Sequence, residues 1–223
     1  MKERLSRETI ALRAAREFQD GDLVNLGVGI PDMCTVFVPE GRTVYLHSEN
    51  GVIGFGPILG EEEWEQADAD FMQAGGYFFR PLPGMCIVDH AMSFDIVRGG
   101  HLDKTVLGAL EVSEQGDLAN WSTGSTSDAG IGGGMDMPVG AKTVIVTMEH
   151  TTRDGGPRIV KECRYPLTGQ RCVDLIVTDL AVIEVTAEGL LLKEIAPGWT
   201  VAEVQALTEP ELIVAAELKE ITL

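Results

Sequence analysis

The sequence is poor in aromatic and basic residues. Only 6% of its 223 residues are aromatic, and 17 Lys and Arg stand against 35 Asp and Glu, so that the formal net charge is −18. So acidic a chain repels nucleic acid and anionic membrane surfaces, and we expect neither as a partner. For the same reason, a polyanionic ligand would need local backbone amides or a second chain to offset the negative charge.

Cysteine and histidine are scarce, with four of each. Neither set contains a Cys-x-x-Cys pair or the spacing of metal ligands, so we expect no metal site. Scattered cysteines are also typical of reduced thiols in an intracellular protein. The residues are Cys34, Cys86, Cys163, Cys172, His47, His90, His101 and His150.

Long hydrophobic runs are missing as well. No uninterrupted apolar run approaches the ~20 residues of a membrane-spanning helix. The first segment, Met1–Leu5, is charged and lacks the apolar core of a signal peptide. We therefore expect a cytoplasmic protein without a membrane partner.

The sequence does contain enough apolar residues, 44%, to bury a core. Strand-like runs alternate with helical patterns, which predicts a three-layer α/β/α domain with a mostly parallel sheet, extended by antiparallel late strands. We expect helices from Ser6 to before Gly21, from about Asp32 to Gly41, over Met92–Val97 and from the capping box Thr200-x-x-Glu203. The predicted strands are 23–26, 43–46, 105–110, 143–148, 175–177, 180–185 and 190–192. No internal repeat or linker divides the chain, so residues 1–223 are predicted to form a single domain.

A glutamate in a tight turn is the most informative single feature. The motif Ser48-Glu49-Asn50-Gly51 follows the predicted strand 43–46 and presents its carboxylate at the end of that strand. A carboxylate is already ionised at pH 7 and could attack an activated acyl group without a base. Taken alone, however, Asn-Gly between apolar segments favours a plain hairpin with a solvated Glu49.

Two glycine-rich segments are the other candidates. Gly27-Val28-Gly29 lies between a predicted strand and a predicted helix, where backbone amides could approach an anion. It does not match a dinucleotide fingerprint, because the third glycine would fall at Asp32. Gly130-Ile131-Gly132-Gly133-Gly134 suits a close approach of backbone to a ligand, as in an oxyanion hole, but its composition also suits a flexible surface loop.

Several motifs in fixed order resemble one enzyme family. They are Gly27-Val28-Gly29-Ile30-Pro31, Ser48-Glu49-Asn50-Gly51, Arg98-Gly99-Gly100-His101-Leu102-Asp103, Gly116-Asp117-Leu118-Ala119-Asn120-Trp121, Gly132-Gly133-Gly134-Met135-Asp136 and Tyr165-Pro166-Leu167-Thr168-Gly169. Together they cover nearly the whole chain and resemble the β subunit of the family I 3-oxoacid CoA-transferases. That group includes the succinyl-CoA:3-ketoacid, 3-oxoadipate and acetoacetate enzymes.

The resemblance implies a fold of the CoA-transferase (NagB/RpiA-like) type and roles for residues of three of the motifs. Glu49 would be the nucleophile, passing through an acyl-glutamyl anhydride and a glutamyl-CoA thioester in ping-pong catalysis, with succinyl-CoA as the expected donor. Gly132, Gly133 and Gly134 would contribute to the oxyanion hole. The remaining predicted site residues, along the active-site floor or the CoA path, are Gly27, Gly29, Asn50 and Gly51.

The resemblance also implies a partner subunit, and it implies a reaction that uses no separate cofactor. Coenzyme A would be a substrate, and an α subunit would complete its site, either in an α2β2 assembly or with this chain forming a homo-oligomer in isolation. Gly134 stands where many relatives carry alanine, and Ser122-Thr123-Gly124-Ser125 lacks the proline and lysines common in the acetoacetate type. These departures leave the acid pair open. Two alternatives remain: a non-catalytic subunit of the same fold and, less favoured because Gly27–Asp32 lacks Ser, Thr or Lys, a sugar-phosphate isomerase-like enzyme.

Overall fold

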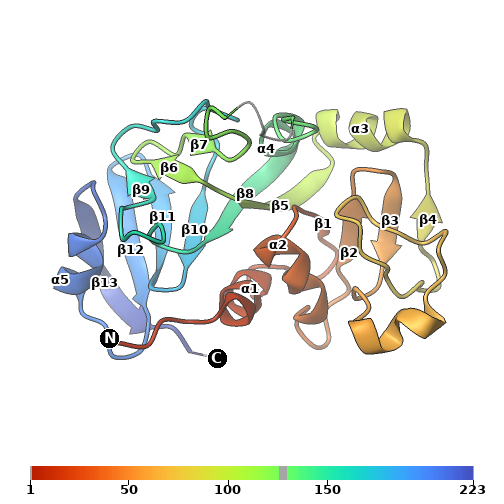
Figure 1. Ribbon diagram of the computed structural model, residues 1–223, viewed down its shortest axis with the longest axis horizontal. Coiled ribbons are helices and arrows are strands. Elements are labelled where there is room, and N and C mark those ends of the chain that lie inside the picture. The colour runs from red at the N-terminus through yellow and green to blue at the C-terminus, as the bar shows by residue number, and fades with distance from the viewer. Residues whose placement is uncertain (1, 126–129, 223) are drawn as a thin grey trace.

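A single ten-stranded sheet forms the centre of the computed structural model, which describes residues 2–125 and 130–222 (Figure 1). The strands lie in the order β13-β12-β11-β10-β8-β5-β1-β2-β3-β4. Their bounds are β1 Leu23–Leu26, β2 Tyr45–Ser48, β3 Val52–Phe55, β4 Cys86–Ile87, β5 Leu102–Gly108, β8 Ala141–Met148, β10 Leu175–Thr178, β11 Ala181–Thr186, β12 Gly189–Ile195 and β13 Leu212–Glu220. A small second sheet has the order β7 (Leu118–Ala119), β6 (Glu111–Ser113), β9 (Ile159–Val160).

The middle of the large sheet is parallel, as the sequence predicts. Strand β1 pairs in parallel with β2 and β5, and β8 pairs in parallel with β5 and β10. The expected antiparallel extension is confirmed in β11 and β12. A second antiparallel extension, β3 and β4, lies at the opposite end, and β13 pairs in parallel with β12; the sequence patterns indicated neither.

Two hydrophobic cores lie on the two faces of the sheet, because successive side chains of a strand point to opposite faces. Ile145 packs in one core with Ile10 of the first helix. Its neighbours Val144 and Val146 pack in the other core, with Phe94 and Met137. Helices cover both faces, so the predicted three-layer arrangement is confirmed.

The helices are short, and their starts follow local capping signals. Ser6 caps α1 by accepting from the Thr9 amide, and Thr200 and Glu203 form both bonds of the predicted capping box of α5. The helices are α1 Arg7–Ala15, α2 Ile30–Met33, α3 His90–Arg98, α4 Asp136–Gly140 and α5 Val201–Ala206, with 3-10 turns η1 Cys34–Val36 and η2 Glu61–Gln66.

The second helix differs from its prediction. It begins at Ile30 rather than near Asp32, and it continues only as the 3-10 turn that ends at Val36, well before Gly41. The physical reason lies in Val38-Pro39, since the residue before a proline is pushed out of the helical region. A helix to Gly41 was therefore excluded by the chain itself.

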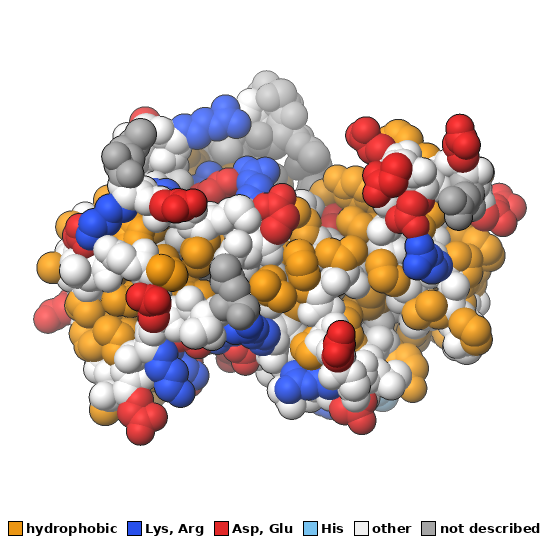
Figure 2. Space-filling model, turned by 90° about the horizontal axis from the view of Figure 1, so that it is seen from below, with side chains coloured by type: hydrophobic (Ala, Val, Ile, Leu, Met, Phe, Trp, Pro, Cys, Tyr) orange, Lys and Arg blue, Asp and Glu red, His pale blue; other side chains and the backbone are white. Residues whose placement is uncertain are grey.

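Charge and apolar surface are mixed on the outside of the molecule. On the face seen in Figure 2, acidic and basic side chains are interspersed, with apolar side chains between them. Within the described ranges, no helix is both long and apolar enough to span a bilayer, and no group of three His, Cys, Asp or Glu could hold a metal ion.

Two buried histidines should make the protein less stable in mild acid. Burial lowers the pKa of His47 and of His150 to about 4, while burial raises the pKa of Asp32 to about 6. The unfolded chain therefore takes up protons on both histidines as the pH falls below 6.5, and each costs about 2 kcal/mol at pH 5. Protonation of Asp32 in the folded state acts in the opposite direction and adds about 1 kcal/mol to the free energy of unfolding between pH 7 and pH 5.

We expect the free energy of unfolding to fall by about 3 kcal/mol between pH 7 and pH 5. Urea denaturation at the two pH values measures this difference. His150 lies between the hydroxyls of Thr178 and Thr208. His150→Gln should therefore remove most of the pH dependence of stability. An unchanged pH dependence in that variant would contradict the claim that buried His150 causes it.

Candidate functional site

Glu49 lies in a tight hairpin between β2 and β3, at the carboxyl end of a parallel strand. The Gly51 amide donates to the Ser48 carbonyl at 2.9 Å, and Ser48 pairs with Val52 across the turn. Gly51 has φ +110°, and a methyl group there would overlap the carbonyl oxygen of Val88. Only glycine fits this position, so the hairpin interpretation is correct for the backbone. The surroundings of the Glu49 side chain then decide between a plain turn and a site.

A cavity of about 420 Å³ opens beside the Glu49 carboxylate. It lies at the carboxyl ends of β1, β2 and β5, where open parallel sheets hold their ligands. Its walls come from segments far apart in the sequence. The lining residues are Asn25, Leu26, Gly27, Val28, Glu49, Ala74, Gly75, Leu107, Asn120, Trp121, Gly130, Ile131, Gly132, Gly133, Gly134 and Met137.

The glycine-rich loop lies directly against Glu49. A methyl group on Gly133 would stand 2.6 Å from Oε2 of Glu49 and 2.7 Å from the ring of Phe94. Gly133 is thus required by space, whereas Gly132 has φ +54° and is required by backbone conformation. The Gly134 amide donates to the Ile131 carbonyl at 3.0 Å and is already used in a turn. Part of the predicted 122–134 loop, residues 126–129, lies outside the described residues.

The electrostatic surroundings make Glu49 more basic than a solvated glutamate. Burial raises the pKa of its carboxyl group, the His90 side chain works against that increase, and the Asp136 carboxylate reinforces it. Asp136 itself is held by Arg98 at 2.7 Å. Glu49 makes no hydrogen bond to any residue that the structure describes, so its oxygens are available to a substrate.

The first glycine segment contributes surface rather than amides. Gly27 lines the cavity, but its amide donates to the Val106 carbonyl at 2.8 Å in the sheet. The Gly29 amide donates to Oδ2 of Asp32 at 3.1 Å. Both glycine amides are therefore engaged within the chain, and the predicted role of Gly27 and Gly29 in binding CoA stays a prediction.

Three predicted CoA-binding residues are not among those that line the cavity in the described chain: Gly29, Asn50 and Gly51. The Asn50 side chain donates to the Met72 carbonyl at 2.8 Å. Asn50 and Gly51 thus shape the turn that carries Glu49, and their place on a CoA path stays a prediction.

Two asparagines and a tryptophan in the cavity wall were not predicted. Asn120 is fixed by bonds from Thr168 at 2.6 Å and to the Gly108 carbonyl at 3.1 Å. The indole nitrogen of Trp121 is buried without a hydrogen-bond partner among the described residues. Asn25 carried a local signal, because it is the polar residue inside the apolar run 23–26. Asn120 and Trp121 end the family motif 116–121, to which no role was assigned from the sequence.

A buried polar chain connects the cavity wall with the helix beyond Glu49. The Asn25 side chain lies 3.1 Å from Nδ1 of His47, whose Nε2 lies 3.0 Å from the hydroxyl of Ser93 on α3. Asn25 also accepts from the Thr105 hydroxyl at 3.1 Å. With Asn25 donating to Nδ1, a neutral His47 carries its proton on Nε2 and donates to Ser93. The strand that ends at Glu49 is thereby tied to β1, β5 and α3.

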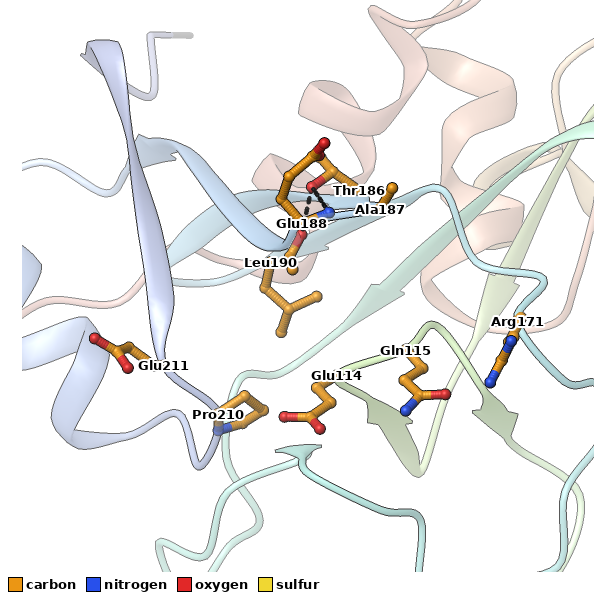
Figure 3. A pocket seen from close by; sticks show the side chains of 10 residues that line it. Glu114, Gln115, Arg171, Thr186, Ala187, Glu188, Leu190, Pro210 and Glu211 are labelled. Carbon is orange, nitrogen blue, oxygen red and sulfur yellow. Dashed lines mark hydrogen bonds between the residues drawn. The ribbon is translucent and has the colours of Figure 1, made fainter.

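A second cavity, of about 550 Å³, shares no lining residue with the first (Figure 3). It lies among the turns after β6 and β11 and the segment before β13, and Thr186 closes its β11–β12 turn by donating to the Gly189 carbonyl. Glu114, Glu188 and Glu211 supply three carboxylates against the single guanidinium of Arg171. That charge balance disfavours a phosphate-bearing ligand, so Glu49 remains at the better candidate site.

Comparisons with known proteins agree on one family. The family model described as Coenzyme A transferase matches residues 7–207. The chain is 45% identical to a subunit of the 3-oxoadipate CoA-transferase of Acinetobacter baylyi, over 96% of this chain and 98% of that protein. It is 47% identical to the mitochondrial succinyl-CoA:3-ketoacid coenzyme A transferase 2B of Mus musculus, over 96% of this chain but only 41% of the mouse protein.

A solved structure shows the same fold. The acyl-CoA transferase apoenzyme of Escherichia coli O157:H7 superposes with a TM-score of 0.75 at 23% identity, covering all of this chain and 45% of that one. The chain thus spans less than half of two of these proteins and nearly the whole of the third. From the family model and the identity along nearly its full length, the chain belongs to the coenzyme A transferase family.

Proposed function

We propose that this chain is the catalytic β subunit of an enzyme that transfers CoA between an acyl-CoA and a carboxylic acid, with Glu49 as the nucleophile. The observation that carries the proposal is the half-buried carboxylate of Glu49, set against Gly133 in a cavity at the carboxyl ends of the parallel strands. A plain hairpin glutamate would point into solvent, without a loop that only glycine allows beside it.

The chemistry follows from a carboxylate that meets a thioester. Glu49 attacks the thioester carbonyl, the thiolate of CoA leaves, and an acyl-glutamyl anhydride forms. The thiolate then attacks the glutamyl carbonyl, releasing the first acid as its carboxylate and leaving a glutamyl-CoA thioester. A second carboxylate attacks that thioester, and the same two steps in reverse return Glu49 and the new acyl-CoA. The complete cycle conserves atoms and electrons without a metal or ATP. Coenzyme A takes part as a substrate.

Each step passes through a tetrahedral oxyanion, first on the acyl carbonyl that Glu49 attacks and then on the glutamyl carbonyl that the thiolate attacks. Hydrogen-bond donors are therefore needed close to the Glu49 carboxyl group. We assign this role to the Gly132 and Gly133 amides, because Gly133 leaves no room for a methyl group beside Glu49 and neither amide has an acceptor among the described residues. The Gly134 amide is engaged with Ile131, so in this arrangement it shapes the loop.

For the acid pair we propose succinyl-CoA as donor and a 3-oxo acid as acceptor. The names of the relatives support this choice: one belongs to a 3-oxoadipate CoA-transferase and is matched over 98% of its length, and another is a succinyl-CoA:3-ketoacid transferase. Both names contain a 3-oxo (keto) acid.

An α subunit is the proposed partner, in an α2β2 assembly. The Acinetobacter relative is named a subunit, and the mouse and Escherichia coli proteins carry more than half of their length beyond the part matched here. A chain with net charge −18 also needs another source of positive charge for the phosphates of CoA.

Intact-mass measurement of the chain, co-expressed with its α partner, tests the proposal. After incubation with succinyl-CoA or acetoacetyl-CoA alone, we expect a covalent gain equal to CoA less one water. The Glu49→Gln variant should show no gain. A stable complex that forms no adduct with any member of a wider acyl-CoA panel would instead indicate a non-catalytic subunit of the same fold.

A further inference from the structure

One wall of the Glu49 cavity is a short segment, residues 72–76, that belongs to no helix and to none of the named strands. The two residues that flank Glu49, Ser48 and Asn50, both form hydrogen bonds to this segment. The Ala74 amide donates to the Ser48 hydroxyl at 2.8 Å, and the Asn50 side chain donates to the Met72 carbonyl at 2.8 Å. One side of this wall is therefore fastened to the turn that carries Glu49.

The other side is fastened to the 27–32 loop by a buried pair of side chains. Nε2 of Gln73 donates to Oδ1 of Asp32 at 3.0 Å, and the Gly29 amide donates to Oδ2 of the same carboxylate at 3.1 Å. Oε1 of Gln73 accepts from the Gly75 amide. Asp32 is only 4% exposed and Gln73 only 5%. The pair thus joins the segment to the loop whose Gly27 lines the cavity.

The Asp32 carboxylate is costly where it lies. It forms no ion pair with any Lys or Arg in the described ranges, and burial raises its pKa to about 6 although both hydrogen bonds oppose that increase. A buried charge without a cation costs several kcal/mol unless hydrogen bonds compensate. An uncharged side chain would serve packing alone at lower cost, which points to a role in holding the wall.

Gly75 is packed closely against the side chains of Gln73 and Asp32. A methyl group on Gly75 would lie 2.9 Å from the Gln73 amide and 3.0 Å from Oδ2 of Asp32. Because Ala74 and Gly75 both line the cavity, a displacement of the segment moves the substrate-facing surface directly.

We propose that Asp32 and Gln73 are positioning residues that hold the 72–76 segment in place as a substrate-binding wall of the Glu49 cavity. This inference rests on the proposed function of Glu49. Neither side chain lines the cavity or contacts the reacting atoms; they act through Ala74 and Gly75.

A reversal of the pair provides the test. In Asp32→Asn, the asparagine has one acceptor oxygen for two donors, so one bond is lost. In Gln73→Glu, two carboxylates face each other. The double variant restores every bond, because Asn at 32 accepts from Gly29 and donates to Glu at 73, which still accepts from Gly75.

In the complex with the α partner, we expect each single variant to raise KM for the acyl-CoA about tenfold with kcat changed much less, and the double variant to return to within about threefold of wild type. Hydrogen–deuterium exchange of a peptide covering 72–76 should speed up in both single variants and recover in the double. A general loss of stability would instead speed up exchange throughout the protein and would lower kcat as well.

Exchange is independent of turnover, so the two claims fail separately. If the wild-type complex transfers no CoA, the proposed function fails, while the exchange pattern still decides the role of the pair. Unchanged exchange in both single variants, or a double variant no better than either, overturns the inference. If Asp32→Asn does not fold, Gln73→Met, which removes the donor without adding a charge, replaces it, and unchanged exchange and KM there overturn the inference equally.

Discussion

Replacing Glu49 with glutamine should reduce CoA transfer by a factor on the order of 10⁴ or more, because an amide is a very poor nucleophile toward a thioester. The substitution keeps the shape of the side chain. Glu49 makes no hydrogen bond to the described residues, so the hairpin has no bond to lose. The melting temperature should stay close to that of wild type, and steady-state kcat/KM for succinyl-CoA with a 3-oxo acid measures the loss.

Glu61→Gln is the matched control. Glu61 is an exposed glutamate of η2, outside the cavity, and the same chemical change there should leave kcat/KM unchanged. If Glu49→Gln kept more than about a hundredth of the wild-type rate, covalent catalysis by this residue would be ruled out.

Gly133→Ala should have the second largest effect, a loss of about 10²–10³-fold in kcat, because a displacement of about 1 Å at the nucleophile already costs about 10²-fold. The added methyl group would meet Oε2 of Glu49 at 2.6 Å and the Phe94 ring at 2.7 Å. The carboxylate must then turn away from the loop amides, and the anhydride and thioester steps lose their alignment together.

Gly108→Ala is the matched control for this change. Gly108 ends β5, has no described atom within 4 Å of an added methyl group, and has no positive φ. It should keep wild-type activity, while Gly133→Ala should form the CoA adduct far more slowly. An alanine at 133 that supports normal turnover would show that the loop does not fix Glu49.

The parts of the fold that could be predicted are those set by neighbours in the sequence. Ser6 and Thr200 cap helices within one turn, and the apolar runs 143–148 and 175–177 are buried on both faces as central parallel strands. Strands β4 and β13 were not predicted. β4 has only two residues and pairs with β3, and β13 is largely exposed, so the short apolar runs 85–88 and 212–216 do not show the alternating burial that marks a strand.

The site divides in the same way. Glu49 was predictable because its turn motif is local, and the 130–134 glycines because their composition is unusual. Their proximity was expected only from the family resemblance. No local pattern shows it, since it depends on the fold that brings the loop to the end of β2. Ala74 and Gly75 gave no signal at all, because their position follows from hydrogen bonds to Ser48 and Asp32, which only the tertiary structure shows.

The short strand β4 has a practical consequence for following this protein in solution. Its Cys86 is exposed, whereas Cys34 is buried and burial raises the pKa of Cys163 to about 12 and that of Cys172 to about 11. A thiol reacts as its thiolate, so a maleimide dye should label Cys86 selectively in the unaltered sequence. Since Cys86 pairs with Ile53, next to the Glu49 hairpin, the dye would report ligand or partner arrival by fluorescence without an engineered label site.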